Sequence, residues 1–258
     1  MRSIIITVFC ILFFVLPVEA ESVVSRGLVD VAGSQRMLTQ RMLRDYVLIG
    51  MNISYQNPSG DLKQIMARFE KQLESIASVA ATEEIRQGCQ VVEKLWQPLK
   101  NVLTREPEKV AVKGVLSDIE ALLGASDALV SLIEKATGGA VAEVVNTAGR
   151  QRMLSQQMAA LYMLYFWEVG NEDIFVQFKQ VVLEYRKANN FLLTNGQTTS
   201  LIREKLNRAA AAFRWFSQVA DNPKQRLNPQ VVQRNSDILL KQMDKITQMY
   251  MDVVERMQ

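Results

Sequence analysis

Two arginines, Arg36 and Arg152, lie in almost identical sequence surroundings, and they are the residues most capable of specific chemistry. Residues 32–42 read AGSQRMLTQRM and residues 148–158 read AGRQRMLSQQM. Eight of these eleven positions are identical at an offset of 116 residues, the separation of the two arginines. Unrelated helical segments would agree at about one position, so we interpret the pair of motifs as an internal duplication.

Each motif predicts a small binding site on one helix face. Positions three and four apart share a face, so each arginine has a glycine one turn before it and a hydroxyl and an amide one turn after it. A partly dehydrated guanidinium favours an oxyanion, because its planar fork donates to two oxygens. The candidate ligand-binding residues are Arg36, Gly33, Thr39, Gln40 and Arg41 in the first motif and Arg152, Gly149, Ser155 and Gln156 in the second.

A simpler interpretation of each arginine stays open. Arginines on helices are usually solvated or paired with a carboxylate of the same protein. The repetition of the small-residue surroundings favours a site, since a solvated residue does not require them. The motif methionines are interpreted as core residues; they are Met37, Met42, Met153 and Met158.

The composition argues against most enzymatic sites. The 258 residues contain no histidine, which disfavours zinc and haem sites and Ser-His-Asp triads. No carboxylate pair stands out, so we expect no catalytic activity, no metal and no cofactor. Of the two cysteines, Cys89 lies on an apolar helical stripe and is expected to be a buried, inert thiol. The net charge of +3 is spread along the chain, so we expect no nucleic-acid partner.

The first twenty residues predict a cleaved signal peptide. Arg2 supplies a positive start, residues 4–16 are apolar, and residues 18–20 read VEA, with small residues at positions −3 and −1 of a cleavage site. The apolar run is shorter than the ~20 residues needed to span a bilayer. We therefore expect an exported protein, most simply located in a bacterial periplasm.

Helical periodicity dominates the rest of the chain and predicts an all-α protein. The first half should hold helices at about 22–55 and 62–79, a third capped by Thr82, and a fourth with Pro107 in its first turn that runs to about Thr137. Gly138-Gly139 marks a seam, at which the chain either turns or continues as one kinked rod. The second half should hold helices at 140–169, 172–193, 199–220 and 229–257. We predict two tandem antiparallel four-helix bundles, residues 21–137 and 138–258.

The two motifs resemble the signature of the PilJ/NarX-type sensor domain, found in type IV pilus chemotaxis transducers and nitrate/nitrite sensor kinases. The resemblance implies a four-helix bundle in each half. In the nitrate-sensing members, the motif arginine binds the anion where two first helices meet across a subunit interface. By resemblance, that role falls to Arg36 and Arg152. The lysine that precedes the Ala-Gly step in those sensors is replaced here by Val31 and Thr147.

Two functional hypotheses follow. The first is a periplasmic, non-enzymatic sensing protein that binds a small anion, with nitrate or nitrite the best guess, and signals by contact with a membrane sensor or transducer. The motif helices could meet within one chain or between the chains of a homodimer. The second is a helical scaffold of a pilus or sensor complex without a ligand, in which the arginines pair with acids.

Overall fold

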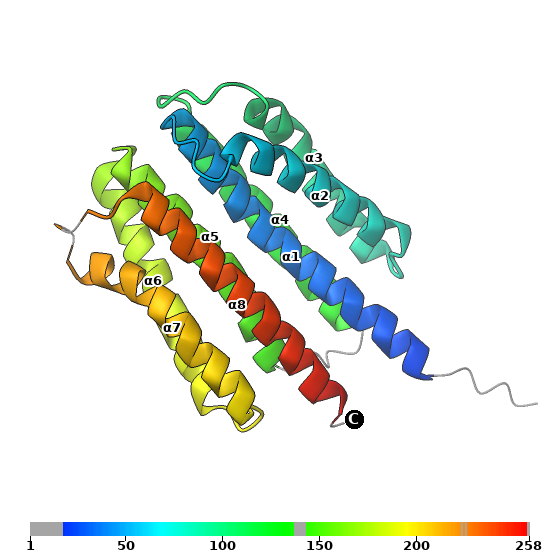
Figure 1. Ribbon diagram of the computed structural model, residues 1–258. Coiled ribbons are helices and arrows are strands. Elements are labelled where there is room, and N and C mark those ends of the chain that lie inside the picture. The colour runs from blue at the N-terminus through cyan, green and yellow to red at the C-terminus, as the bar shows by residue number, and fades with distance from the viewer. Residues whose placement is uncertain (1–17, 137–142, 223, 225, 257–258) are drawn as a thin grey trace, which may run out of the picture.

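The computed structural model describes residues 18–136, 143–222, 224 and 226–256, and all regular structure within these ranges is helical. This agrees with the predicted all-α class (Figure 1). The helices are α1 (Val18–Gly50), α2 (Pro58–Ser78), α3 (Glu83–Leu103), α4 (Val112–Ala136), α5 (Glu143–Phe166), α6 (Asn171–Thr194), α7 (Ser200–Asp221) and α8 (Pro229–Glu255).

Within the described ranges, these eight helices form two four-helix units that meet along α1 and α5. Within the first unit α1 packs against α2 and α4, and α3 packs against α4. The second unit repeats this arrangement, with α5 against α6 and α8, and α7 against α8. Contacts between α2 and α3, and between α6 and α7, are sparse by comparison. Figure 1 shows the helices aligned roughly along one direction, with α1 and α5 towards the middle of the described part of the chain.

The first helix ends five residues earlier than the periodicity predicts, at Gly50 instead of Tyr55. The chain leaves the helix through Asn52, which adopts a left-handed conformation (φ 57°). The Asn52 N–H donates to the Ile49 carbonyl and the next N–H donates to the Leu48 carbonyl, the pattern of a Schellman motif. Apolar periodicity continues past this point in the sequence, so it overestimated the length of the helix.

The same helix end recurs 116 residues later. Glu168 is also left-handed (φ 60°), and its N–H donates to the Tyr165 carbonyl. The following residue, Val169, donates to the Leu164 carbonyl. Glutamate rarely adopts a left-handed conformation. The backbone at the end of α5 nevertheless repeats that at the end of α1, although the residues differ.

The starts of α3 and α4 test two further predictions. The Thr82 side chain accepts a hydrogen bond from the Ile85 N–H (3.3 Å), which confirms the predicted cap of α3. The predicted start of the fourth helix is wrong, because Pro107 lies in the preceding loop. A separate turn, closed by the Ala111 N–H donating to the Glu108 carbonyl, intervenes before α4 begins at Val112.

The signal-peptide prediction falls mostly outside the described residues, as does the glycine seam at residues 138–139. The proposed cleavage motif at residues 18–20 coincides with the start of α1. In the portion of the chain that the structure describes, no helix combines the length and apolar character needed to cross a bilayer.

Each half has its own aromatic core. In the first, Phe69 of α2 packs against Trp96 of α3 with ring centroids 4.9 Å apart. In the second, Tyr185 of α6 stacks on Phe213 of α7 at 4.5 Å. Cys89 is a buried free thiol whose pKa is raised by burial, as expected of an inert cysteine. The four motif methionines are likewise buried, which confirms their assignment to the core.

Candidate functional site

The two motif arginines meet at the interface between α1 and α5. Arg36 is 6% exposed and Arg152 is 7% exposed. A Cβ atom placed on Gly33 would lie 3.5 Å from Arg36 Nη2 and 4.0 Å from Arg152 Nη2. Both guanidiniums therefore approach the same point on α1. A Cβ atom placed on Gly149 would lie 3.4 Å from Arg152 Nη2, an ordinary van der Waals distance, so each glycine lies directly beside the guanidinium that follows it.

Each arginine crosses the interface to an equivalent position on the other helix. Arg152 Nη2 donates to Asp30 Oδ1 of α1 at 2.7 Å. Arg36 Nη2 donates to Asn146 Oδ1 of α5 at 3.4 Å. Asp30 and Asn146 are themselves separated by the repeat offset of 116 residues. The two motif helices are thus related by an approximate twofold exchange of contacts, and they meet within a single chain.

A carboxylate from the last helix of each unit completes the coordination. Arg36 Nη1 donates to Asp127 of α4 at 2.6 Å, and Arg152 Nη1 contacts Asp244 of α8 at 3.3 Å. The side chains of Asp127 and Asp244 are 54% and 51% exposed. Pairing with carboxylates, the simpler interpretation of these arginines, is therefore confirmed for both. With Asp30 included, three carboxylates contact two guanidiniums.

Several buried donors at the motif remain without a partner among the described residues. They are Nε of Arg36, Nε of Arg41, Nε of Arg152 and Nε2 of Gln40. Buried N–H groups are normally paired, and an unpaired one costs about 1–3 kcal/mol. The motif therefore has spare capacity to donate hydrogen bonds, even though its arginines already contact carboxylates.

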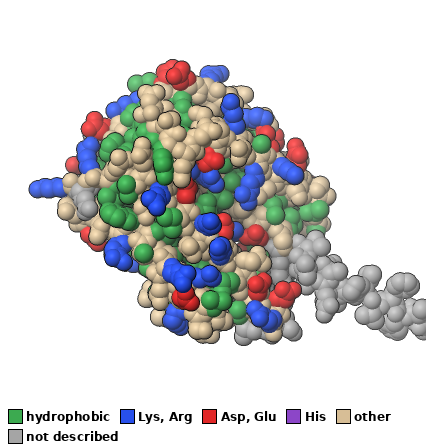
Figure 2. All heavy atoms as spheres, viewed as in Figure 1, with side chains coloured by type: hydrophobic (Ala, Val, Ile, Leu, Met, Phe, Trp, Pro, Cys, Tyr) green, Lys and Arg blue, Asp and Glu red, His purple; other side chains and the backbone are tan. Residues whose placement is uncertain are grey.

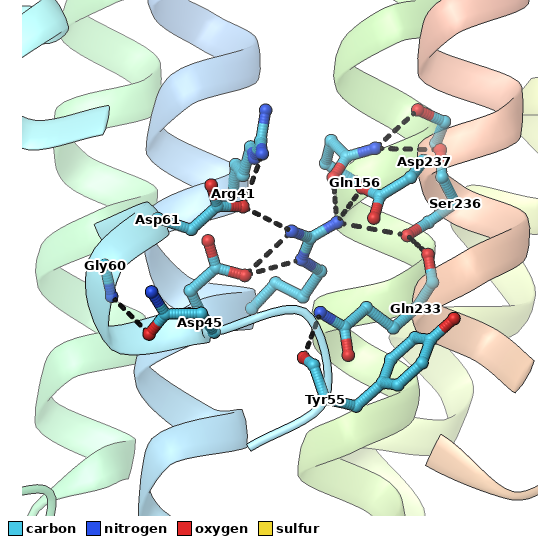
Figure 3. Close-up of polar contacts among 12 residues, drawn as sticks. Arg41, Asp45, Tyr55, Gly60, Asp61, Gln156, Gln233, Ser236 and Asp237 are labelled. Carbon is cyan, nitrogen blue, oxygen red and sulfur yellow. Dashed lines mark hydrogen bonds and ion pairs between the residues drawn. The ribbon is translucent and has the colours of Figure 1, made fainter. Parts of the chain in front are cut away.

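The motif hydroxyls do not supply hydrogen bonds to a common site. Thr39 Oγ1 donates to the Arg36 carbonyl at 2.8 Å, and Ser155 Oγ donates to the Arg152 carbonyl at 2.7 Å. Each hydroxyl thus bonds back to its own helix. Arg41 pairs instead with Asp61 of α2 (Figure 3).

The glutamine that precedes each arginine has a structural role that the sequence reasoning missed. Gln35 Nε2 donates to the Phe69 carbonyl at 3.1 Å, and Gln151 Nε2 donates to the Tyr185 carbonyl at 3.2 Å. These bonds hold α2 on α1 and α6 on α5. Part of the motif identity therefore reflects packing, and the identity of this glutamine in both copies could have indicated it.

A second polar group, also missed, lies two turns beyond Arg36 on the same face of α1. Arg44 and Asp45 are both fully buried, with no exposed side-chain surface. Arg44 donates to Asp45, to Gln156 of α5 and to Asp237 of α8. Figure 3 shows Asp45, Asp61, Gln156 and Asp237 converging from four different helices on this guanidinium.

Burial and pairing act in opposite directions on this group. Burial alone would lower the pKa of Arg44. The neighbouring carboxylates of Asp45 and Asp237 together have the larger effect, so the Arg44 pKa is raised. Burial also raises the pKa of Asp45 to about 6, although the guanidinium of Arg44 partly offsets the effect. The second carboxylate oxygen of Asp45, Oδ2, is buried and has no hydrogen-bond partner among the described residues. Desolvation therefore dominates the titration of Asp45.

The duplication breaks at this point. The residues 116 positions after Arg44 and Asp45 are Ala160 and Leu161, both buried and apolar. The motif alignment ends before these positions, so comparison of the two copies did not draw attention to them. An adjacent pair of opposite charges within an otherwise apolar helical stretch was the available indication in the sequence.

The surface carries no comparable concentration of charge on the face shown in Figure 2, where basic and acidic side chains are interspersed. Shallow grooves lie where the middle helices of each unit diverge. One of about 550 Å³ lies between α2 and α3, and one of about 350 Å³ lies between α6 and α7. Neither groove contains a motif arginine.

Comparison with known families gives a match to the first half of the chain. Residues 22–119 match the family model described as the N-terminal part of type IV pili methyl-accepting chemotaxis transducers, called PilJ. This range covers most of α1, all of α2 and α3, and the start of α4, and it includes the first motif. The searches of curated proteins and of solved structures gave no match. Residues 22–119 thus form a PilJ-type domain, the kind of domain that serves chemotaxis transducers as a sensory input.

Proposed function

We propose that this protein is a non-enzymatic sensory input protein that binds a small anion where α1 meets α5. The observation that carries the proposal is the convergence of two buried guanidiniums on Gly33, each with an Nε–H that no described residue accepts. Two such guanidiniums could donate charge-assisted hydrogen bonds to a small oxyanion from two sides. Nitrate or nitrite is the ligand that the family resemblance suggests.

The carboxylates around the arginines define how such a ligand would bind. Asp127 and Asp244 are half exposed, so each can leave its arginine and return to water at small cost. Binding is then an exchange, in which the anion replaces one or both carboxylates. This exchange would reorient side chains of α4 and α8 and so connect the site with the outer helices.

We further propose that residues 138–258 form a second unit of the same type, following the first at residues 21–137. The matching helix ends, the matching glutamine bonds and the exchanged arginine contacts support this division. The pair α1–α5 would then reproduce within one chain the subunit interface that related sensors make from two. Export to the periplasm and contact with a membrane sensor or transducer complete the proposal.

Calorimetric titration with nitrate, nitrite and other small oxyanions tests the anion site. Arg36→Gln and Arg152→Gln should each abolish the binding heat while leaving the helical circular dichroism nearly unchanged. Arg150→Gln is the matched control, because Arg150 lies on the same helix as Arg152, is exposed and, among the described residues, pairs only with Glu184. Absence of heat with every anion, or equal binding by all three variants, would contradict the proposal.

The arginine–carboxylate pairs favour a second candidate, a helical scaffold without a ligand. In that case Arg36 and Arg152 fasten α1 and α5 to each other and to α4 and α8. A ligand at a hundred times its dissociation constant stabilises a protein by about 2.7 kcal/mol. A melting temperature indifferent to all the anions, together with co-purification of a membrane sensor, would support the scaffold over the anion site.

A further inference from the structure

The buried charges around Arg44 join four helices at one point. Arg44 and Asp45 belong to α1, Asp61 to α2 and Asp237 to α8, while Gln156 of α5 accepts from Arg44 at 2.8 Å. Ser236 Oγ of α8 also accepts from Arg44 at 3.2 Å, and the Ser236 carbonyl accepts from Gln156 at 3.0 Å. We call the charged residues of this group the Arg44 cluster; its members are Arg41, Arg44, Asp45, Asp61 and Asp237.

The charges of the Arg44 cluster do not balance when every member is ionised. Two guanidiniums then face three carboxylates, and Asp45, which is fully buried, has one oxygen without a donor. Asp61 and Asp237 keep 29% of their side-chain surface exposed, so water still reaches them. The excess negative charge therefore falls on Asp45. One proton on its Oδ2 would balance the cluster, while Oδ1 continues to accept from Arg44.

We propose that the Arg44 cluster is a proton-sensitive latch, which holds α1, α5 and α8 together when Asp45 is protonated and loosens their junction when Asp45 is ionised. The ionised form leaves an unbalanced charge in a dry interface, and separation of the helices relieves it by admitting water. The protonated form removes that penalty without breaking the hydrogen bonds of Arg44. The latch would act on the same helix pair as the motif arginines, but it needs no ligand.

The direction of the pH effect follows from the burial of Asp45. Its pKa in the closed junction is about 6, raised from 3.8 by desolvation. A carboxyl with a raised pKa stabilises the closed form fully below pH 3.8, and this stabilisation is lost as the pH rises through 6. If the carboxyl regains its ordinary pKa on opening, the open population should be about tenfold greater at pH 7.5 than at pH 5.

Hydrogen–deuterium exchange of the full chain tests this latch. After correction for the intrinsic pH dependence of exchange, amides of residues 233–240 in α8 should exchange about tenfold faster at pH 7.5 than at pH 5. Asp45→Asn carries a permanently neutral side chain, so its exchange should not change between the two pH values. Asp221→Asn is the control, because Asp221 is an exposed carboxylate, and it should keep the tenfold difference.

A second variant and a direct titration keep the outcome unambiguous. The double substitution Arg44→Ala with Asp45→Leu installs the residues found 116 positions later, and it should also abolish the difference. In the unmodified chain, the carboxyl carbon resonance of Asp45 should titrate with a midpoint near pH 6. A midpoint near pH 4, or an unchanged pH response in Asp45→Asn, would overturn the latch. Neither result depends on anion binding, so these experiments test the latch independently of the proposed ligand site.

Discussion

Replacement of Arg44 by methionine removes the only guanidinium that donates to Asp45 among the described residues, while keeping a long apolar side chain at the site. Asp45 is completely buried, so it would be left as a dry carboxylate with no donor to its oxygens. Asp237 of α8 would lose the same partner, although its partial exposure lets water replace the guanidinium.

The structure sets both the size and the pH dependence of the effect. Removal of one partner from a buried ion pair costs about 3–5 kcal/mol, because the remaining charge is uncompensated. The matched substitution Arg36→Met should cost only about 1 kcal/mol, since its partner Asp127 is half exposed and returns to water. At pH 5 the loss from Arg44→Met should be smaller, because the pKa of Asp45 is about 6 with Arg44 present and rises further without it.

Urea unfolding followed by circular dichroism measures these differences directly. The free energy of unfolding should be determined for the unmodified chain, Arg44→Met and Arg36→Met at pH 8 and at pH 5. The double variant Arg44→Met with Asp45→Leu should recover most of the lost stability, because the buried carboxylate is then removed together with its partner. Equal losses for Arg44→Met and Arg36→Met at pH 8, or a loss from Arg44→Met that does not shrink at pH 5, would refute the reasoning.

Two further pairs of substitutions test the packing. Tyr185→Phe should leave stability unchanged or raise it by up to ~1 kcal/mol, because the buried Tyr185 hydroxyl has no partner in the part of the chain that the structure describes. Tyr162→Phe should instead lose ~1 kcal/mol or more, since that hydroxyl both accepts from and donates to the backbone of the loop before α8. Gly124→Ala should stabilise α4 by ~1 kcal/mol, because its Cβ meets open space. Gly50→Ala should destabilise, because its Cβ would overlap the ring of Trp167. Thermal unfolding of each variant checks these expectations, and a reversed order within either pair would contradict them.

The sequence was sufficient to predict the elements of this fold and the location of its repeated motif. Helical periodicity and the Thr82 cap depend on neighbouring residues, so they can be derived locally. The end of α1 could not be derived in this way, because the apolar periodicity continues past the left-handed Asn52. Whether the helix ends or continues there depends on tertiary packing. The same limit applies to Pro107, which is compatible with a helix start but lies in a loop.

The partners of the arginines were beyond sequence reasoning for a different reason. The carboxylates that contact Arg36 and Arg152 come from other helices, 91 or more residues away in the chain. A pairing of that range depends on how α1, α4, α5 and α8 are placed side by side. Asp30 is the clearest example, since it lies close to Arg36 in sequence but bonds to Arg152.

The position of the Arg44 cluster bears on why these two units share one polypeptide. In a symmetric dimer, every side chain at the axis meets its own duplicate, so an arginine there would face a second arginine. Here Arg44 and Asp45 instead lie opposite a segment that has Ala160 and Leu161 at the corresponding positions. Covalent fusion allows the two sides of such an interface to evolve independently, so one side can carry a buried ionisable pair and the other can remain inert.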